Sequence, residues 1–321
     1  MPFETEAVLD RRALRRRLGA WRTAGLAAGV VALGTLAYTA AGPDRSRGNE
    51  IARVAIEGII TEDRQQLLML RRLAETKTVS GVILAINSGG GTTTGGEALY
   101  EAIRTLAKTK PVVAQFGTVA ASAAYICGLG TDHIVARGNS ITGSVGVIFQ
   151  WPEVSGLLDK VGVKMNEIKS GPLKAEPSPF GPITPDGRRA AEAMVAESQV
   201  WFLGLVKSRR GVDTAAVPGL EQGRIFSGRE AVTHKLVDEI GGEAEAVAWL
   251  ESRPGVPKGL SVRTWRPAPA RGAGLSGWLG SALHEVWQGA AGGNTWLSEI
   301  DTMRTRLSLD GLVSVWQPHE K

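Results

Sequence analysis

The sequence predicts an α/β protein built around a mostly parallel sheet. After residue 50, apolar strand-like runs alternate with amphipathic helical patterns, as they do in α/β domains. The runs VILAI and PVVAQF are apolar on both faces, which is typical of strands covered by helices on two sides. With 321 residues, of which 43% are hydrophobic and 21% charged, the chain can bury a sizeable core, and most of it is not intrinsically disordered.

The expected strands and helices follow one another along the chain. The expected strands are Ile51–Ile60, Gly81–Asn87, Pro111–Phe116, His133–Ala136 and Val163–Ile168. The expected helices are Asp63–Glu75, Gly95–Lys108, Val119–Leu129, Pro152–Val161, Thr184–Arg210 and Gly228–His234.

The first 43 residues have the composition of a membrane anchor. Residues 1–22 carry six arginines against three acidic residues, and residues 23–43 contain no charged side chain. About 20 apolar residues cross a bilayer as a helix, and a basic flank stays in the cytoplasm. We therefore expect a single pass through the inner (cytoplasmic) membrane, with everything after Pro43 on the outer, periplasmic side.

A cleaved signal peptide is the alternative, because small residues at 37–41 could form a processing site. The length of the apolar run favours an uncleaved anchor. The net charge of +5 comes largely from the arginine cluster, so the folded part is not expected to bind nucleic acid.

The remaining sequence divides into a linker at 44–50, a main domain at 51–252 and a C-terminal extension at 253–321. The extension begins with a segment rich in Pro, Gly and Arg, typical of a linker or extended arm. An apolar helical stripe follows from Leu275 to Leu307, bearing tryptophans. This stripe could pack on the domain, contact another subunit or bind a membrane surface.

Three small, glycine-rich stretches follow apolar runs, where α/β sheets usually carry their functional residues. They are residues 87–96 (NSGGGTTTGG), 117–125 (GTVAASAAY) and 142–146 (TGSVG). The first could be mistaken for a phosphate-binding loop, but no GxxxxGK[ST] pattern is present. Cys127 is the sole cysteine, which excludes an intrachain disulfide and a cysteine-rich metal site.

Ser122 lies near the start of an expected helix, whose free N–H groups favour a developing negative charge. A serine nucleophile needs a base, and His133 is the one plausible histidine. The other candidate is Lys174, in the Gly- and Pro-rich loop IKSGPLKAEPSP. A lysine would need desolvation that lowers its pKa by roughly three units to act as base near neutral pH.

The stretches INSGGG, GTVAASAAY, TGSVGVI, IKSGPLKAEPSP and GRIFSGREAVTHKLVDEIGG together resemble the signal peptide peptidase A (protease IV) family. They occur in the family's order over roughly residues 51–245. The resemblance implies a crotonase- and Clp-protease-like fold, a ββα superhelix. It also implies a catalytic dyad of Ser122 and Lys174, with Ser144 holding the lysine.

The same resemblance assigns the oxyanion hole to the backbone N–H groups of Gly90 and Ala123. It places Gly89, Gly91, Ala124 and Tyr125 along the substrate cleft. Relatives usually read SPGG and ASGGYY where this chain reads SGGG and ASAAYI. The extra methyl groups at Ala123 and Ala124 would narrow the cleft if those positions line it.

The implied reaction is hydrolysis of unfolded hydrophobic peptides, such as cleaved signal peptides, by an endopeptidase that needs no metal or cofactor. Short members of the family assemble into a ring in which the serine and lysine can come from neighbouring subunits. Two alternatives stay open: a catalytically inactive membrane-bound scaffold of the same fold, and an acyl-CoA enzyme of the crotonase superfold.

Overall fold

The computed structural model describes residues 48–267 and 313–315, together with helical positions at 19, 21–26, 29 and 31. The chain divides into two compact units, Met1–Gly48 and Asn49–Lys321. The second unit contains the sheet and every residue of the candidate site, and the description below concerns that unit.

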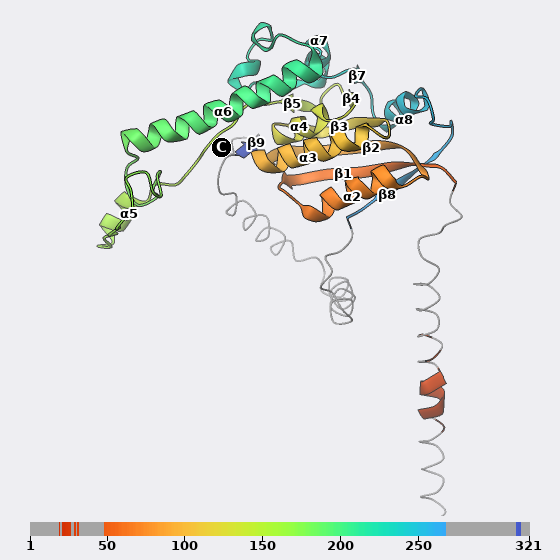
Figure 1. Ribbon diagram of the computed structural model, residues 1–321, viewed down its shortest axis with the longest axis horizontal. Helices are drawn as coiled ribbons and strands as arrows, with labels where there is room; N and C mark the ends of the chain where they lie inside the picture. The colour runs from red at the N-terminus through yellow and green to blue at the C-terminus, as the bar shows by residue number, and fades with distance from the viewer. Residues whose placement is uncertain are drawn as a thin grey trace, which may run out of the picture. The chain divides into compact units, whose positions relative to one another are not determined.

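The second unit is organised around one sheet whose strands run in the order β6-β5-β3-β2-β1-β8 (Figure 1). These strands are β1 (Glu50–Ile60), β2 (Val79–Thr92), β3 (Val112–Ala121), β5 (Ile141–Gly143), β6 (Ile225–Ser227) and β8 (Ser261–Trp265). Off this path lie β4 (His133–Ala136), β7 (Glu239–Ile240) and β9 (Val313–Val315). The pairs β5–β6 and β2–β9 are antiparallel and the others are parallel, so the predicted, mostly parallel sheet is confirmed.

Several helices of the second unit begin where a side chain caps free amides. Asp63, Thr92 and Thr184 accept hydrogen bonds from the first-turn amides of α2, α3 and α6, as N-cap residues do. The helices are α2 (Arg64–Glu75), α3 (Thr93–Ala107), α4 (Ala123–Leu129), α5 (Ser155–Lys160), α6 (Pro185–Arg210), α7 (Gly228–Thr233) and α8 (Glu243–Glu251).

Apolar residues are buried on both faces of the sheet, as the runs VILAI and PVVAQF predict. Val82 and Leu84 belong to a large core that includes residues of α2, α3 and α4. Ile83, between them, belongs to a smaller core that includes Leu250 of α8. Because successive side chains of a strand point to opposite faces, β2 joins the two cores.

The part of the chain that follows β5, including α5 and the N-terminal half of α6, forms an arm. Its short helix α5 lies near the N-terminal end of α6, away from the sheet (Figure 1). Large apolar side chains along the arm are exposed, and Ile168 is fully so. The strand predicted at Val163–Ile168 is wrong, since no strand forms there. A strand needs a neighbouring strand to satisfy its backbone, and this exposed segment has none among the described residues.

Two boundaries in the structure differ from the predicted ones. The helix expected at Val119–Leu129 begins only at Ala123, because β3 continues to Ala121. The sheet also extends past the domain boundary predicted after residue 252, since β8 pairs in parallel with β1 and Trp265 lies opposite Val54. Small apolar residues fit a strand or a helix, so the pattern alone could not place the end of β3.

Most of the predicted anchor, residues 23–43, lies outside the described residues. Within the part of the chain that the structure describes, no helix is both long and apolar enough to cross a membrane.

Candidate active site

Ser122 occupies a sharp turn between β3 and α4. Its backbone has φ 59° and ψ −123°, and the residue is almost completely buried, with 1% of its surface exposed. The Ser122 amide donates to the Gly143 carbonyl at 2.9 Å, while the Ser122 carbonyl accepts from the Ile126 amide of α4 at 3.1 Å. A serine on a tight strand-to-helix turn is the geometry that α/β hydrolases use to present a nucleophile.

The turn is strained, and such strain is concentrated near the predicted site. Among the described residues, four that are not glycine have a positive φ: Ser122, Ser144, Ala175 and Lys235. Two of these are predicted site residues, and Ala175 follows the predicted base Lys174 directly. Each such residue costs on the order of 1–3 kcal/mol and persists where the surrounding structure enforces it, which is frequent at functional sites.

Ser144 lies beside Ser122 because their strands are paired in parallel. Ala121 of β3 is opposite Gly143 of β5, so the two serines directly follow paired residues on neighbouring strands. Neighbouring strands are about 4.8 Å apart. The Ser144 amide donates to the Arg224 carbonyl at 2.9 Å, which fixes the turn after β5. The structure therefore brings together two of the three residues predicted to carry the chemistry.

Gly90 and Ala123 lie at the same end of the sheet. Ala123 is the first residue of α4, where an amide has no acceptor within its own helix. The Gly90 amide donates to Ser88 Oγ at 3.0 Å, and Ser88 Oγ in turn donates to the Gly58 carbonyl at 2.6 Å. The Gly90 amide could therefore donate to an oxyanion only after its hydrogen bond to Ser88 Oγ is broken.

The glycines beside Gly90 have different environments. A side chain at Gly91 would approach the Ile60 carbonyl oxygen to 1.9 Å, so only glycine lets β1 and β2 pair there. Gly89 is half-buried in the same strand. Both glycines lie at the C-terminal end of β2, and their place along a substrate cleft stays a prediction.

Ala124 and Tyr125 do not line a cleft in this chain. Both are fully buried in the large core, and the Tyr125 hydroxyl donates to the Leu236 carbonyl at 2.8 Å. The added Ala123 methyl lies toward α3, where Gly96 has no side chain to obstruct it. The core beneath the turn therefore accommodates Ala123 and Ala124, where relatives usually carry glycine. Comparison of sequence motifs alone could not show this packing.

Lys174 is exposed on the arm, in a loop held together by other charged residues. Lys169 Nζ lies 2.9 Å from Glu167 Oε2 and 3.4 Å from Glu176 Oε1, and the hydrogen bond to Glu167 raises the pKa of Lys169. Desolvation pushes the pKa of Glu176 upward, but hydrogen bonds from Thr184 and Lys169 outweigh it and hold that pKa below its usual value. Lys174 has no ion pair among the described residues.

The loop that carries Lys174 is far from the serines within one chain. Glu176 packs against Gly187 in the first turn of α6, whereas Gln199 of α6 donates to the Val145 carbonyl, next to Ser144. Gly187 and Gln199 are separated by about 18 Å at about 1.5 Å per helical residue. Among the described residues, a single chain therefore does not bring Lys174 to Ser122.

His133 is not a rival base in this chain. It pairs with Val113 near the start of β3, and Ser122 follows Val113 by nine residues, roughly 30 Å along a strand. The imidazole stacks on Trp249 at 4.9 Å between ring centroids, with Nδ1 3.6 Å from Asp238 Oδ2. The His133 side chain thus packs near the start of β3, at the end opposite Ser122.

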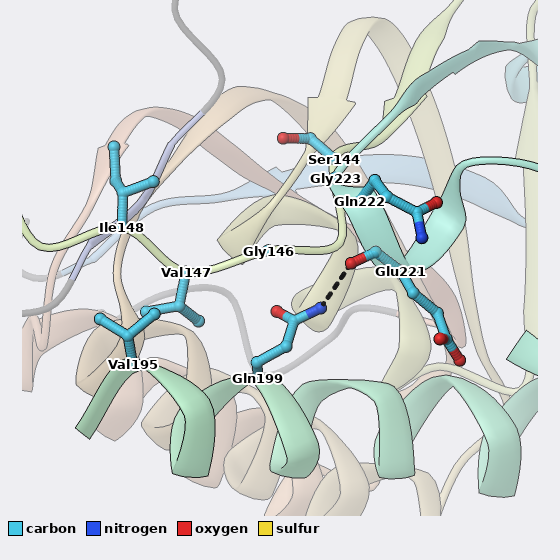
Figure 2. A pocket seen from close by; sticks show the side chains of 9 residues that line it. All are labelled: Ser144, Gly146, Val147, Ile148, Val195, Gln199, Glu221, Gln222 and Gly223. Atoms are coloured by element: carbon cyan, nitrogen blue, oxygen red, sulfur yellow. Dashed lines mark hydrogen bonds between the residues drawn. The ribbon is translucent and has the colours of Figure 1, made fainter. Parts of the chain in front are cut away.

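A pocket of about 330 Å³ adjoins Ser144, and the sequence analysis missed it (Figure 2). Val147 and Ile148 follow β5, Val195 and Gln199 come from α6, and residues 221–223 complete the wall. Gln199 donates to the Glu221 carbonyl at 3.3 Å. These segments are far apart in sequence, and no motif marks α6 as part of a site. Among the described residues, no group of His, Cys, Asp or Glu could hold a metal ion.

The strained turn predicts an unusual order of stability at Ser122. The free energy of unfolding should be about 1–2 kcal/mol higher for Ser122→Gly than for Ser122→Ala, because glycine tolerates positive φ. Urea unfolding of the two variants measures the difference. At Ser198, inside α6, the same two substitutions should rank in the opposite order, since alanine favours a helix. Equal stability of the two Ser122 variants would contradict the strain.

Two family models match the chain. The model of peptidase family S49 matches residues 104–256, and the Clp protease model matches residues 49–137. Together they cover the strands and helices that form the candidate site, from β1 through α8.

Curated relatives agree with these models. A protein of Enterococcus faecium, provisionally named signal peptide peptidase SppA, is 33% identical over 261 residues, covering 75% of this chain and 73% of the relative. A Synechocystis protein, provisionally named a protease, is 32% identical over 212 residues, covering 66% of this chain and 76% of the relative. Protease 4 of Haemophilus influenzae is 31% identical over 209 residues, but only 34% of that longer protein is covered. The chain belongs to peptidase family S49, with relatives that include proteins named as signal peptide peptidases and protease 4.

Proposed function

We propose that this S49 peptidase is a serine endopeptidase in which Ser122 is the nucleophile and Lys174 of a neighbouring copy is the general base. The observation that carries the proposal is the strained, buried Ser122 turn directly beside Ser144. A backbone conformation that costs on the order of 1–3 kcal/mol is frequent at functional sites, where the surrounding structure enforces it.

The arm supports the contribution of a second copy. Leu157 and Val161 are among its exposed large apolar side chains, with 62% and 64% of their surfaces accessible. Apolar surface of this extent on one segment is typical of a protein–protein contact. An exposed lysine is also a poor base, because an ordinary ammonium group titrates near 10.4. Burial of the Lys174 amine against a second copy would disfavour its charged form.

The proposed reaction is acyl transfer to Ser122 followed by hydrolysis. The neutral Lys174 amine takes the Ser122 hydroxyl proton as the oxygen attacks the peptide carbonyl, and Ser144 holds the amine in place. The Ala123 amide and the Gly90 amide, once released from Ser88, stabilise the oxyanion. The lysine then protonates the departing amine, and a water molecule, deprotonated by the same lysine, releases the acyl group as a carboxylate.

We further propose that the substrates are unfolded hydrophobic peptides, such as cleaved signal peptides, and that the protein is held at the membrane by residues 23–43. The uncharged stretch and its arginine flank support this topology. The copies that share the site would form a homo-oligomeric ring.

A fluorophosphonate probe tests the nucleophile and the base in the full-length protein. We expect labelling of Ser122 in the wild type, loss of labelling in Ser122→Ala, and at least about 100-fold slower labelling in Lys174→Ala, since general-base catalysis contributes about 10²–10⁴-fold. Mass spectrometry of the labelled peptide is the measurement. Lys164→Ala removes another exposed lysine of the arm and should label normally. Absent labelling of the wild type would favour the inactive scaffold.

Mixing two inactive variants tests whether the dyad is shared. Co-expressed Ser122→Ala and Lys174→Ala chains should regain part of the peptidase activity, because one chain supplies an intact serine and the other an intact lysine. Each variant alone should stay inactive. Peptide hydrolysis by the co-purified mixture is measured. Full inactivity of a mixed assembly would show that both residues must come from one chain.

Membrane attachment is tested by fractionation. The full-length chain should sediment with membranes and resist extraction by high salt, whereas deletion of residues 1–43 should release it. An anchor held by apolar burial is insensitive to salt, unlike a bound basic segment. Release of the full-length chain by salt alone would contradict the anchor.

A further inference from the structure

Strand β3 contains two extra residues where it passes Asn87 of β2. Ile86 pairs with Phe116, and the next pair along the two strands is Ser88 with Ala120. β2 therefore advances by two residues over a stretch in which β3 advances by four. Such an irregularity is a β-bulge, and bulges are frequent next to active sites, where they change the direction of a side chain.

The bulge decides which part of β2 lies beside the proposed nucleophile. Continuing the register beyond the bulge by two residues brings Gly90 level with Ser122. Without the two extra residues, Ser122 would be level with Thr92 instead. At about 3.3 Å per residue, this is a displacement of roughly 7 Å along the strand. The bulge thus brings the nucleophile to the candidate oxyanion glycine.

Apolar patterning does not choose between the register with the bulge and the register without it. Side chains of a strand alternate with a period of two, so a shift by one residue exchanges its two faces, whereas a shift by two residues keeps them. Both registers would therefore bury the same face of β3 beyond the bulge. The choice between them requires a local interaction that fixes the extra residues.

The side chain of Asn87 provides such an interaction. Its Oδ1 accepts hydrogen bonds from two amides of the bulge, those of Thr118 at 3.0 Å and Val119 at 3.2 Å. The preceding residue, Gly117, approaches Asn87 so closely that an added Cβ would lie 3.0 Å from Oδ1. One acceptor oxygen of β2 thus holds two consecutive amides of the bulge.

The other edge of β3 changes its partner at the same place. β3 pairs with β4 as far as Phe116 and with β5 from Val119 onward. Between these pairings, the buried Ser140 hydroxyl donates to the Gly117 carbonyl at 2.6 Å. The bulge is therefore fixed from both edges, by Ser140 at a carbonyl and by Asn87 at two amides.

Asn87 differs from Ser140 because its side chain is exposed. It adds little to the hydrophobic core, so its replacement should change the turn without unfolding the domain. Given the proposed peptidase function, on which this inference rests, we propose that Asn87 is a positioning residue for that reaction. Its Oδ1 fixes the bulge of β3 and so aligns Ser122 with the oxyanion donor Gly90.

Two variants of similar size separate the acceptor oxygen from the volume of the side chain. Asn87→Leu removes both hydrogen bonds, whereas Asn87→Asp keeps an acceptor in the same place. In the full-length protein, we expect Asn87→Leu to lower kcat by about 10–100-fold, since a misplaced group in a site can cost about 100-fold. KM should change by less than about threefold, because an oxyanion donor acts in the transition state. Asn87→Asp should stay within several-fold of the wild type. Steady-state hydrolysis of an unfolded apolar peptide gives both constants.

Hydrogen exchange tests the bulge without any need for activity. The segment 117–122 should exchange at least about tenfold faster in Asn87→Leu than in the wild type or in Asn87→Asp, because its amides lose an acceptor. Mass spectrometry of the peptides measures this rate. Asn49→Leu is the matched control: it changes an exposed asparagine just before β1, at the opposite end of the sheet, and should alter neither kcat nor the exchange.

Unchanged exchange of residues 117–122 in Asn87→Leu would overturn the proposal. So would an unchanged kcat, or a loss in Asn87→Asp as large as that in Asn87→Leu. Failure of the peptidase function would be distinct: the wild type would neither hydrolyse the peptide nor react with the fluorophosphonate probe, while the exchange would still respond to Asn87→Leu.

Discussion

The candidate site depends on the register of three parallel strands. β2, β3 and β5 end at the same end of the sheet, and the pairing of β3 with each of the other two brings Gly90, Ser122 and Ser144 to that end. β3 must then turn sharply into α4, and Ser122 takes a backbone conformation that few residues other than glycine adopt. The strain is sustained by buried neighbours on every side of the turn, so the fold stabilises a geometry that the local sequence disfavours.

Within the part of one chain that the structure describes, Lys174 lies away from the two serines. Ser122 is buried and Ser144 is half-buried, whereas Lys174 is exposed on an arm that carries several exposed apolar side chains. Separation of nucleophile and base would couple activity to assembly, because an isolated chain could not deprotonate its own serine. Such coupling suits a peptidase with unfolded substrates, since a free chain would be harmless to other proteins.

The sequence by itself determined the mostly parallel α/β class, and its motifs indicated the peptidase family, because apolar periodicity and local motifs depend on short-range patterns. It did not exclude His133 as a base, nor did it show that Tyr125 is a core residue or that Val163–Ile168 lacks a strand. Only the tertiary structure decided these points, together with the pocket at Gln199 and the pairing of β9. Each depends on register or on contacts between segments distant in sequence, which hydrophobic periodicity does not encode.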